Sequence, residues 1–195
     1  MNILFISKHK SPHIGGVEKH ILEVSKNLKQ KGHNIRIISE EDIKPPQIKI
    51  LGLLYIWYWL FKNRHLIVRC HLVHIHDVFI WYLPFRFMYS KKMVYTTFHG
   101  WEGKYPIPMW NILNKRIATK LSTGSIAVGK YIEKYYGIKV NKIIYGATTL
   151  IHINRVEKIK NSIVYLGRQD SDTGYLEFLD WLKIHGQKMK VKFIN

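Results

Sequence analysis

The stretch KHKSPHIGGVEKHILEV, residues 8–24, decides the fold, because it joins a buried strand to an amphipathic helix. The run before it, NILFIS at residues 2–7, is short and almost wholly apolar, as in strands of a parallel sheet covered on both faces. A plain turn needs only one glycine, whereas this junction has Gly15 and Gly16. Two glycines allow a ligand to approach the backbone closely, although the pair taken alone fits a structural turn better.

The rest of the chain repeats this alternation of strands and helices. The first helix is predicted over 17–31, with apolar residues spaced by three and four, and Gly32 favours its end. Alternating elements of this kind predict a Rossmann-like α/β fold, with a parallel sheet flanked by helices. Further strands are expected at 34–39, 72–76, 93–98, 124–128 and 142–145, and further helices at 109–121 and 130–136.

The C-terminal part reads as a separate, smaller piece. We expect a Rossmann-like domain over 1–147 and a polar interdomain linker over 148–161. Residues 162–195 then predict one βαβ unit, which is shorter than the roughly 40 residues a domain needs to bury its own core. This piece is therefore expected to be the incomplete start of a second domain.

Composition bounds the class of protein. With 47% hydrophobic residues in 195, the chain is expected to be globular, and its single cysteine, Cys70, fits a reducing compartment. The first residues lack the pattern of a signal peptide. The longest apolar run, residues 50–61, is below the roughly 18 residues needed to span a bilayer. We therefore expect a cytoplasmic, non-spanning protein.

The charge is strongly positive, with 31 Lys and Arg against 13 Asp and Glu and a net charge of +18. Such a balance favours a phosphorylated ligand, an anionic membrane or nucleic acid, unless lysine-rich codon usage alone explains it. No nucleic-acid-binding motif is recognisable, so nucleic acid is not expected as a partner.

A segment rich in aromatic residues, 51–69, predicts a helix for which two roles are open. It can pack on the sheet as part of the core. Alternatively, its tyrosines and tryptophans can lie at lipid headgroups while Lys62, Arg64 and Arg69 contact lipid phosphates, peripherally at the inner face of the membrane. The sequence FIWYLPFRFMY at 79–89 has the same character.

Polar residues follow several predicted strands and should share the carboxyl edge of the sheet, where ligands bind in such folds. His74, His76 and Asp77 end one strand, and His99 ends the next. The first two could be read as metal ligands, but a third ligand is not evident and no metal is expected. His99 is a candidate for catalysis or a structural histidine. In GRQDSDTG at 167–174, Arg168 would emerge at a strand end and could bind a diphosphate.

Six motifs occur in a fixed order along the chain: HIGGVEKH at 13–20, VHIHD at 73–77, TTFHG at 96–100, GSIAVGKYIEKYYGI at 124–138, IIYGA at 143–147 and IVYLGR at 163–168. Together they resemble family-four retaining glycosyltransferases of the GT-B fold. That resemblance implies two facing Rossmann-like domains with a nucleotide-sugar donor in the cleft and a glycan or lipid-linked acceptor on the N-terminal side. It implies retention of anomeric configuration without a metal or other cofactor.

The resemblance also implies roles for individual residues. Gly15 and Gly16 would face the donor diphosphate, His99 would lie near the transferred sugar, and Arg168 would help to neutralise the leaving diphosphate. Asp77, Glu102 and Tyr145 are candidates on the acceptor side.

The chain also departs from the family. Thr173 stands where the family usually has a lysine, and Tyr145 precedes Gly146 where Asn-Gly is usual. The paired glutamates that hold the donor belong to a part of the second domain that these residues lack. We therefore expect no sugar transfer by this chain alone. It is expected to be a truncated glycosyltransferase or one chain of a split enzyme, with a non-catalytic basic module that binds anionic membrane as the alternative.

Overall fold

The computed structural model describes residues 1–13, 15–100, 106–145, 162–165, 174–186 and 190–193. The chain divides into two compact units, Met1–Thr148 and Thr149–Asn195.

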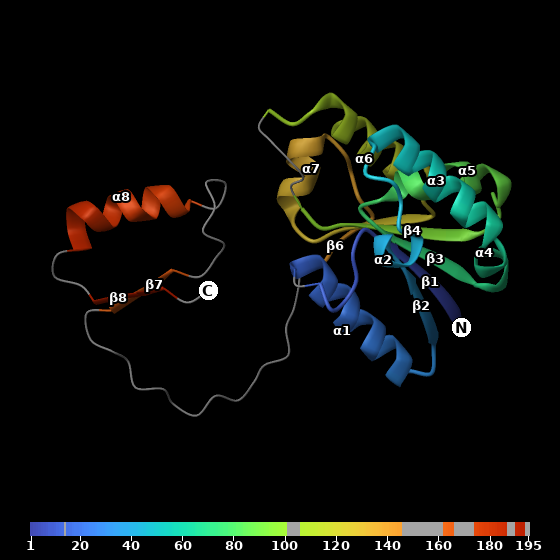
Figure 1. Ribbon diagram of the computed structural model, residues 1–195, viewed down its shortest axis with the longest axis horizontal. Coiled ribbons are helices and arrows are strands. Elements are labelled where there is room, and N and C mark those ends of the chain that lie inside the picture. The colour runs from blue at the N-terminus through green and yellow to red at the C-terminus, as the bar shows by residue number, and fades with distance from the viewer. Residues whose placement is uncertain (14, 101–105, 146–161, 166–173, 187–189, 194–195) are drawn as a thin grey trace. The chain divides into compact units, whose positions relative to one another are not determined.

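The first unit is built on a six-stranded sheet in which every neighbouring pair is parallel (Figure 1). The strand order β2-β1-β3-β4-β5-β6 reverses direction at β1, which creates a topological switch point between β1 and β3. The α/β class predicted from the sequence is therefore confirmed. The strands are β1 (Asn2–Ser7), β2 (Asn34–Ile38), β3 (Leu72–His76), β4 (Met93–Phe98), β5 (Gly124–Ala127) and β6 (Lys142–Ile143).

One face of this sheet is covered by α1 (Gly16–Gln30). The stripe predicted from the spacing packs there, and Ile21 is fully buried against Ile3, Phe5 and Ile35. The helix ends as predicted near Gly32, whose φ of 80° is in the left-handed region. The N–H of the following residue donates to the carbonyl of Leu28, so the last helical carbonyls are satisfied by a Schellman motif.

The longer helices of the first unit other than α1 lie on the opposite side of the sheet (Figure 1). They bury the larger core cluster, which includes Leu4, Ile6, Val73 and Ile75 from the central strands. Two short helices, α2 and α4, complete the unit. The bounds are α2 (Glu40–Ile43), α3 (Lys49–Lys62), α4 (His65–Arg69), α5 (Phe79–Met88), α6 (Met109–Leu121) and α7 (Lys130–Tyr136).

The single helix expected over 51–69 is in fact two helices, α3 and α4. α3 ends at its C-cap residue Asn63, whose side-chain amide donates to the carbonyl of Trp59, at 2.9 Å, in addition to its backbone N–H. Helix α5 contains Pro84, which cannot donate to the carbonyl of Ile80 four residues earlier. The indole of Trp57 on α3 donates to that carbonyl instead, at 3.0 Å.

The second unit contains β7 (Ser162–Tyr165), α8 (Tyr175–His185) and β8 (Lys190–Phe193). The two strands pair in parallel, so the three elements form a βαβ unit. The ring of Tyr165 lies 5.3 Å from that of Tyr175 and 5.0 Å from that of Phe178, which joins strand and helix. No residue of α8 is buried.

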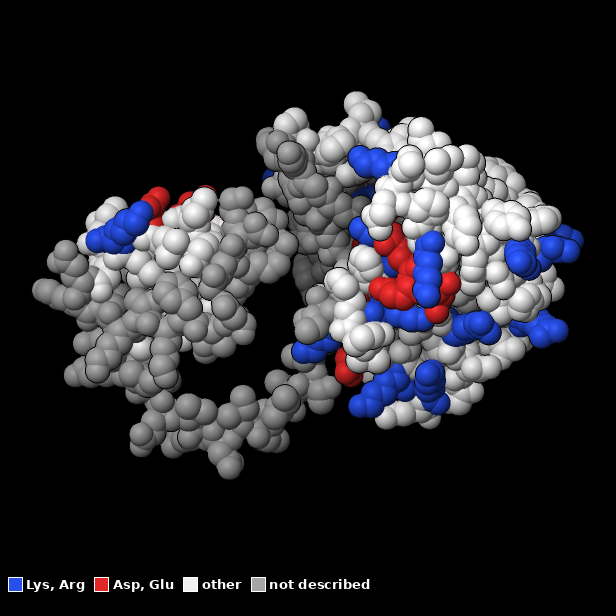
Figure 2. Space-filling model, viewed as in Figure 1, with Lys and Arg blue, Asp and Glu red and all other residues white. Residues whose placement is uncertain are grey.

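No described helix is long and apolar enough to cross a membrane. On the face drawn in Figure 2, Lys and Arg are scattered widely, whereas Asp and Glu of the first unit gather at the place of α2. Three of the four residues of that helix are acidic: Glu40, Glu41 and Asp42.

Candidate active site

The paired glycines stand where β1 leads into α1. Gly15 is the N-cap of the helix with extended backbone (φ −172°, ψ 164°), and no side chain caps the first turn. A Cβ on Gly15 would lie 2.1 Å from a carboxylate oxygen of Glu18, so this glycine makes room for that carboxylate. A Cβ on Gly16 would meet nothing within 4 Å. The space beside Gly16 is therefore open, as an anion-binding site requires, while the Glu18 carboxylate lies at Gly15.

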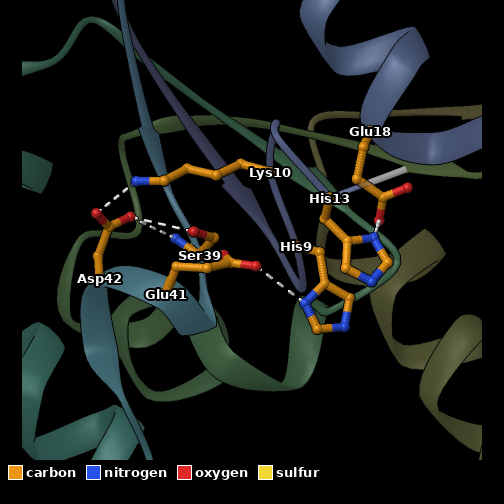
Figure 3. A network of polar contacts seen from close by, with 7 residues as sticks. All are labelled: His9, Lys10, His13, Glu18, Ser39, Glu41 and Asp42. Atoms are coloured by element: carbon orange, nitrogen blue, oxygen red, sulfur yellow. Dashed lines mark hydrogen bonds and ion pairs between the residues drawn. The ribbon is translucent and has the colours of Figure 1, made fainter. Parts of the chain in front are cut away.

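The loop before these glycines is tied to α2 by a polar network (Figure 3). Lys10 is paired with Asp42, and the ring of His9 lies 3.1 Å from a carboxylate oxygen of Glu41. Asp42 also accepts from Ser39 in a capping box at the start of α2. These contacts fix the loops after β1 and β2 against each other at the carboxyl edge of the sheet.

Asp77, directly after β3, holds the start of the loop after β4. Its backbone is in the left-handed region, with φ of 61°. Its carboxylate accepts from the backbone N–H of His99, at 3.1 and 3.2 Å, and from the Lys115 ammonium on α6, at 2.9 Å. The Lys115 side chain is only 4% exposed and lies over the rings of Phe98 and Tyr136. The structure thus gives Asp77 a positioning role beneath His99.

Four histidines gather on the α1 side of the sheet. His20 of α1 makes an edge contact with the ring of His99, with centroids 4.8 Å apart. His74 and His76 of β3 stack at 4.4 Å, and Nδ1 of His76 lies 2.9 Å from Nε2 of His99. The cluster brings the first turns of α1 close to the end of β4, which joins the glycine loop to His99.

Burial makes these histidines poor bases. It lowers the pKa of His74 to about 4, helped by the nearby imidazoles of His99 and His20, and lowers the pKa of His76 well below the ordinary value. Burial also lowers the pKa of His99 to about 4; the Asp77 carboxylate acts in the opposite direction. At neutral pH the cluster is therefore uncharged.

When both imidazoles are neutral, one hydrogen atom lies between His76 Nδ1 and His99 Nε2, and the nitrogen that donates it can be assigned. Nε2 of His76 is buried without a hydrogen-bond partner. If that nitrogen carried hydrogen it would be an orphaned buried N–H, which is rarer than an under-used acceptor. The geometry therefore favours donation from His76 Nδ1 to His99 Nε2, which leaves the hydrogen of His99 on Nδ1. That Nδ1 makes no hydrogen bond to any described residue.

Tyr145, another candidate on the acceptor side, is not joined to this cluster. It follows β6, is 68% exposed, and makes no hydrogen bond or ring contact with the described histidines. Glu102 and Arg168 lie outside the described residues. Although four histidines lie together, no group of three or more His, Cys, Asp or Glu among the described residues could hold a metal ion.

His20 and Lys115 were missed by the sequence analysis, although a signal for each is present. His20 follows Val17 by three residues and precedes Val24 by four, so helical spacing puts it on the stripe facing the sheet. Lys115 likewise follows Ile112 by three and precedes Ala118 by three, a charged residue on a buried stripe. Buried charges of this kind are usually paired.

Residues 14–145, which contain the glycine pair, the histidine cluster and Asp77, match the family model Glycosyltransferase Family 4. The match covers more than half of the chain, and the protein therefore belongs to this glycosyltransferase family. No curated protein sequence matches the chain.

Proposed function

We propose that the protein takes part in transferring a sugar from a nucleotide-sugar donor to a glycan or lipid-linked acceptor, with retention of anomeric configuration. It would form the acceptor-side domain of a GT-B arrangement. The observation that supports this most is the contact between His20 and His99, because it brings an open helix N-terminus and a candidate active-site imidazole to one edge of the sheet.

In this proposal each group has a defined task. The N–H groups at Gly15 and Gly16 receive the donor diphosphate. The Nδ1–H of His99 donates a hydrogen bond to an oxygen of the transferred sugar. It does not transfer its proton, because a neutral imidazole is a poor acid. Arg168 provides positive charge for the leaving diphosphate, which a reaction without a metal needs. Asp77, Glu102 and Tyr145 are assigned to the acceptor side, and no metal or other cofactor is required.

The donor half would come from further sequence or from a separate chain. The test is a transfer assay with radiolabelled nucleotide-sugars and a bacterial-type lipid extract, run with this chain alone and with a donor domain supplied in cis or in trans. We expect labelled product only when the donor domain is present. Turnover by this chain alone would refute the division of the site.

The role of His99 can be tested in that reconstituted enzyme. His99→Ala should lower turnover at least about tenfold, the usual loss for a positioned polar group. Arg168→Ala should do the same. His65→Ala is the matched control, since His65 is exposed at the start of α4. Normal turnover in both site variants would remove the assignment.

The solvent-exposed apolar face of α3 favours a second function, which is peripheral binding to an anionic membrane on the cytoplasmic side. The helix packs into the core through Ile56 and Leu60, yet its other side exposes a row of large apolar residues. Lys49 and Lys62 flank that row. Exposed members of the row are Ile50, Leu51, Leu54, Tyr55, Tyr58 and Phe61.

Vesicle co-sedimentation tests this second function. We expect binding to vesicles with anionic lipid, weakened by salt, and little binding to neutral vesicles. Equal binding to both would show that the basic residues do not contribute. Anionic binding combined with no transfer by any reconstituted form would favour the non-catalytic module.

A further inference from the structure

A groove of about 630 Å³ lies at the carboxyl edge of the sheet, apart from the histidine cluster. Part of its lining is apolar: Leu53 and Ile56 of α3 and Trp81 of α5. Trp110, in the first turn of α6, also lines it and is 58% exposed. The segment after α2, residues 44–47, provides more of the lining. Trp110 and the half-buried Leu53 therefore present indole and hydrocarbon surface to solvent in the groove, whereas Ile56 and Trp81, at 4% and 6% exposed, form its floor.

The groove is held open by close packing behind it. A Cβ on Gly52 would lie 2.7 Å from the carbonyl oxygen of Pro46, so only glycine lets this segment lie directly against α3. Pro45 and Pro46 have fixed φ and no backbone N–H to satisfy. The segment can therefore keep one conformation without a partner, which is what a preformed site needs.

Three lysines among the lining residues give the groove its charge. Lys8, Lys44 and Lys49 are all exposed, and none makes an ion pair with a described residue. They face one lining carboxylate, Glu40. The other two acidic residues of α2 are already engaged by His9 and Lys10. Free cations thus outnumber free carboxylates, and an anion is favoured.

We propose that this groove binds one phosphate-bearing lipid chain, with the phosphate among the three lysines and the first hydrocarbon units along Leu53 and Trp110. Neither half of the lining specifies this ligand alone: the lysines would take any anion and the apolar wall any small hydrocarbon. An amphiphile with a phosphate head satisfies both. This inference rests on the proposed function, since it narrows the acceptor to a lipid-linked phosphate.

The probe is octyl phosphate, used with the intact chain below its micelle concentration and followed through the indole N–H resonances in ¹H–¹⁵N spectra. We expect saturable shifts for Trp81 and Trp110 and none for Trp181, which lies in the second unit. Each methylene buried should tighten binding about fourfold, so decyl phosphate should bind roughly 16-fold tighter than octyl phosphate. Octanol and inorganic phosphate should each bind at least about tenfold more weakly.

Two pairs of substitutions make the test specific. Lys44→Gln with Lys49→Gln should weaken octyl phosphate at least about tenfold while leaving octanol unchanged. The matched control is Lys26→Gln with Lys29→Gln, because these two lysines are exposed on α1, outside the groove. Equal losses in both pairs, or octanol binding as tight as octyl phosphate, would overturn the proposal.

Failure of this inference can be told apart from failure of the proposed function. In the reconstituted enzyme, His99→Ala should lower transfer at least about tenfold yet leave octyl phosphate binding intact, because His99 does not line the groove. Intact transfer without octyl phosphate binding would overturn the groove assignment alone. A response to anionic vesicles but not to monomeric octyl phosphate would assign this face to membrane docking and would also overturn it.

Discussion

Replacing Lys115 by methionine tests the buried ion pair beneath His99. The Lys115 and Asp77 side chains are 4% and 14% exposed, with their charged atoms 2.9 Å apart. Methionine keeps most of the apolar stem against Phe98 and Tyr136 but leaves the carboxylate with one donor, the His99 backbone N–H. Breaking a buried pair costs about 3–5 kcal/mol. We expect about 3 kcal/mol, because Asp77 keeps that hydrogen bond and some contact with water.

A double-mutant cycle measured by urea denaturation isolates the pair. Asp77→Asn alone should cost about 2–3 kcal/mol, and the double variant should cost about 2 kcal/mol less than the sum of the two. The free energy of unfolding comes from the transition of the first unit, followed by circular dichroism. A Lys115→Met cost below about 1 kcal/mol, or strict additivity, would refute the argument that the two charges depend on each other.

The same variants should move the pKa of His99 in opposite directions. The Lys115 ammonium lowers that pKa and the Asp77 carboxylate raises it, although burial is the largest influence. Lys115→Met should therefore raise the pKa of His99, and Asp77→Asn should lower it. The Cε1 proton resonance followed against pH reports both. Shifts in the same direction would contradict the geometry.

Three further predictions concern other contacts. The native pKa values of His74 and His99 are about 4, below the unfolded value near 6.5, so the stability due to these neutral histidines should be complete above pH 6.5 and fall as pH drops toward 4. Each histidine should remove about 2 kcal/mol of unfolding free energy between pH 7.5 and 5. A urea midpoint that stays constant across this range would contradict the neutral cluster. Trp57→Phe leaves the Ile80 carbonyl without its donor and should cost about 1–2 kcal/mol in urea, whereas a cost near zero would show that water replaces the indole. Glu18→Gln removes a carboxylate from the open N-terminus of α1 and should tighten binding of a nucleoside diphosphate in an amide-shift titration, while weaker binding would show that the carboxylate helps the ligand.

Strands were the most predictable part of this protein, for a physical reason. β1, β3 and β4 are central strands covered on both faces, so most of their residues are buried, and their bounds match the prediction. The helix predicted over 51–69 was harder, because an all-round apolar helix has no periodicity to mark its end. There the break depends on Asn63, whose side-chain hydrogen bond competes with the helical pattern.

The candidate site was less predictable than the fold, because its contacts join residues far apart in sequence. That Asp77 and His99 share an edge follows from strand order alone. The ion pair between Asp77 and Lys115 depends on how α6 packs over β4, and it joins residues 38 positions apart in the sequence. The motifs therefore predicted which residues lie at this edge of the sheet, but not which of them contact one another there.

The chemistry of this edge follows from which groups carry charge. The four histidines are neutral at pH 7, and the charge of Lys115 is matched by Asp77. Among the described residues around His99, the groups offered to a ligand are therefore hydrogen-bond donors without net charge. Such donors can orient a sugar, but expelling a diphosphate also needs positive charge that the histidine cluster does not supply. Arg168, from the second unit, is the cation we assign to that task, which makes His99→Ala and Arg168→Ala complementary tests of orientation and of leaving-group stabilisation.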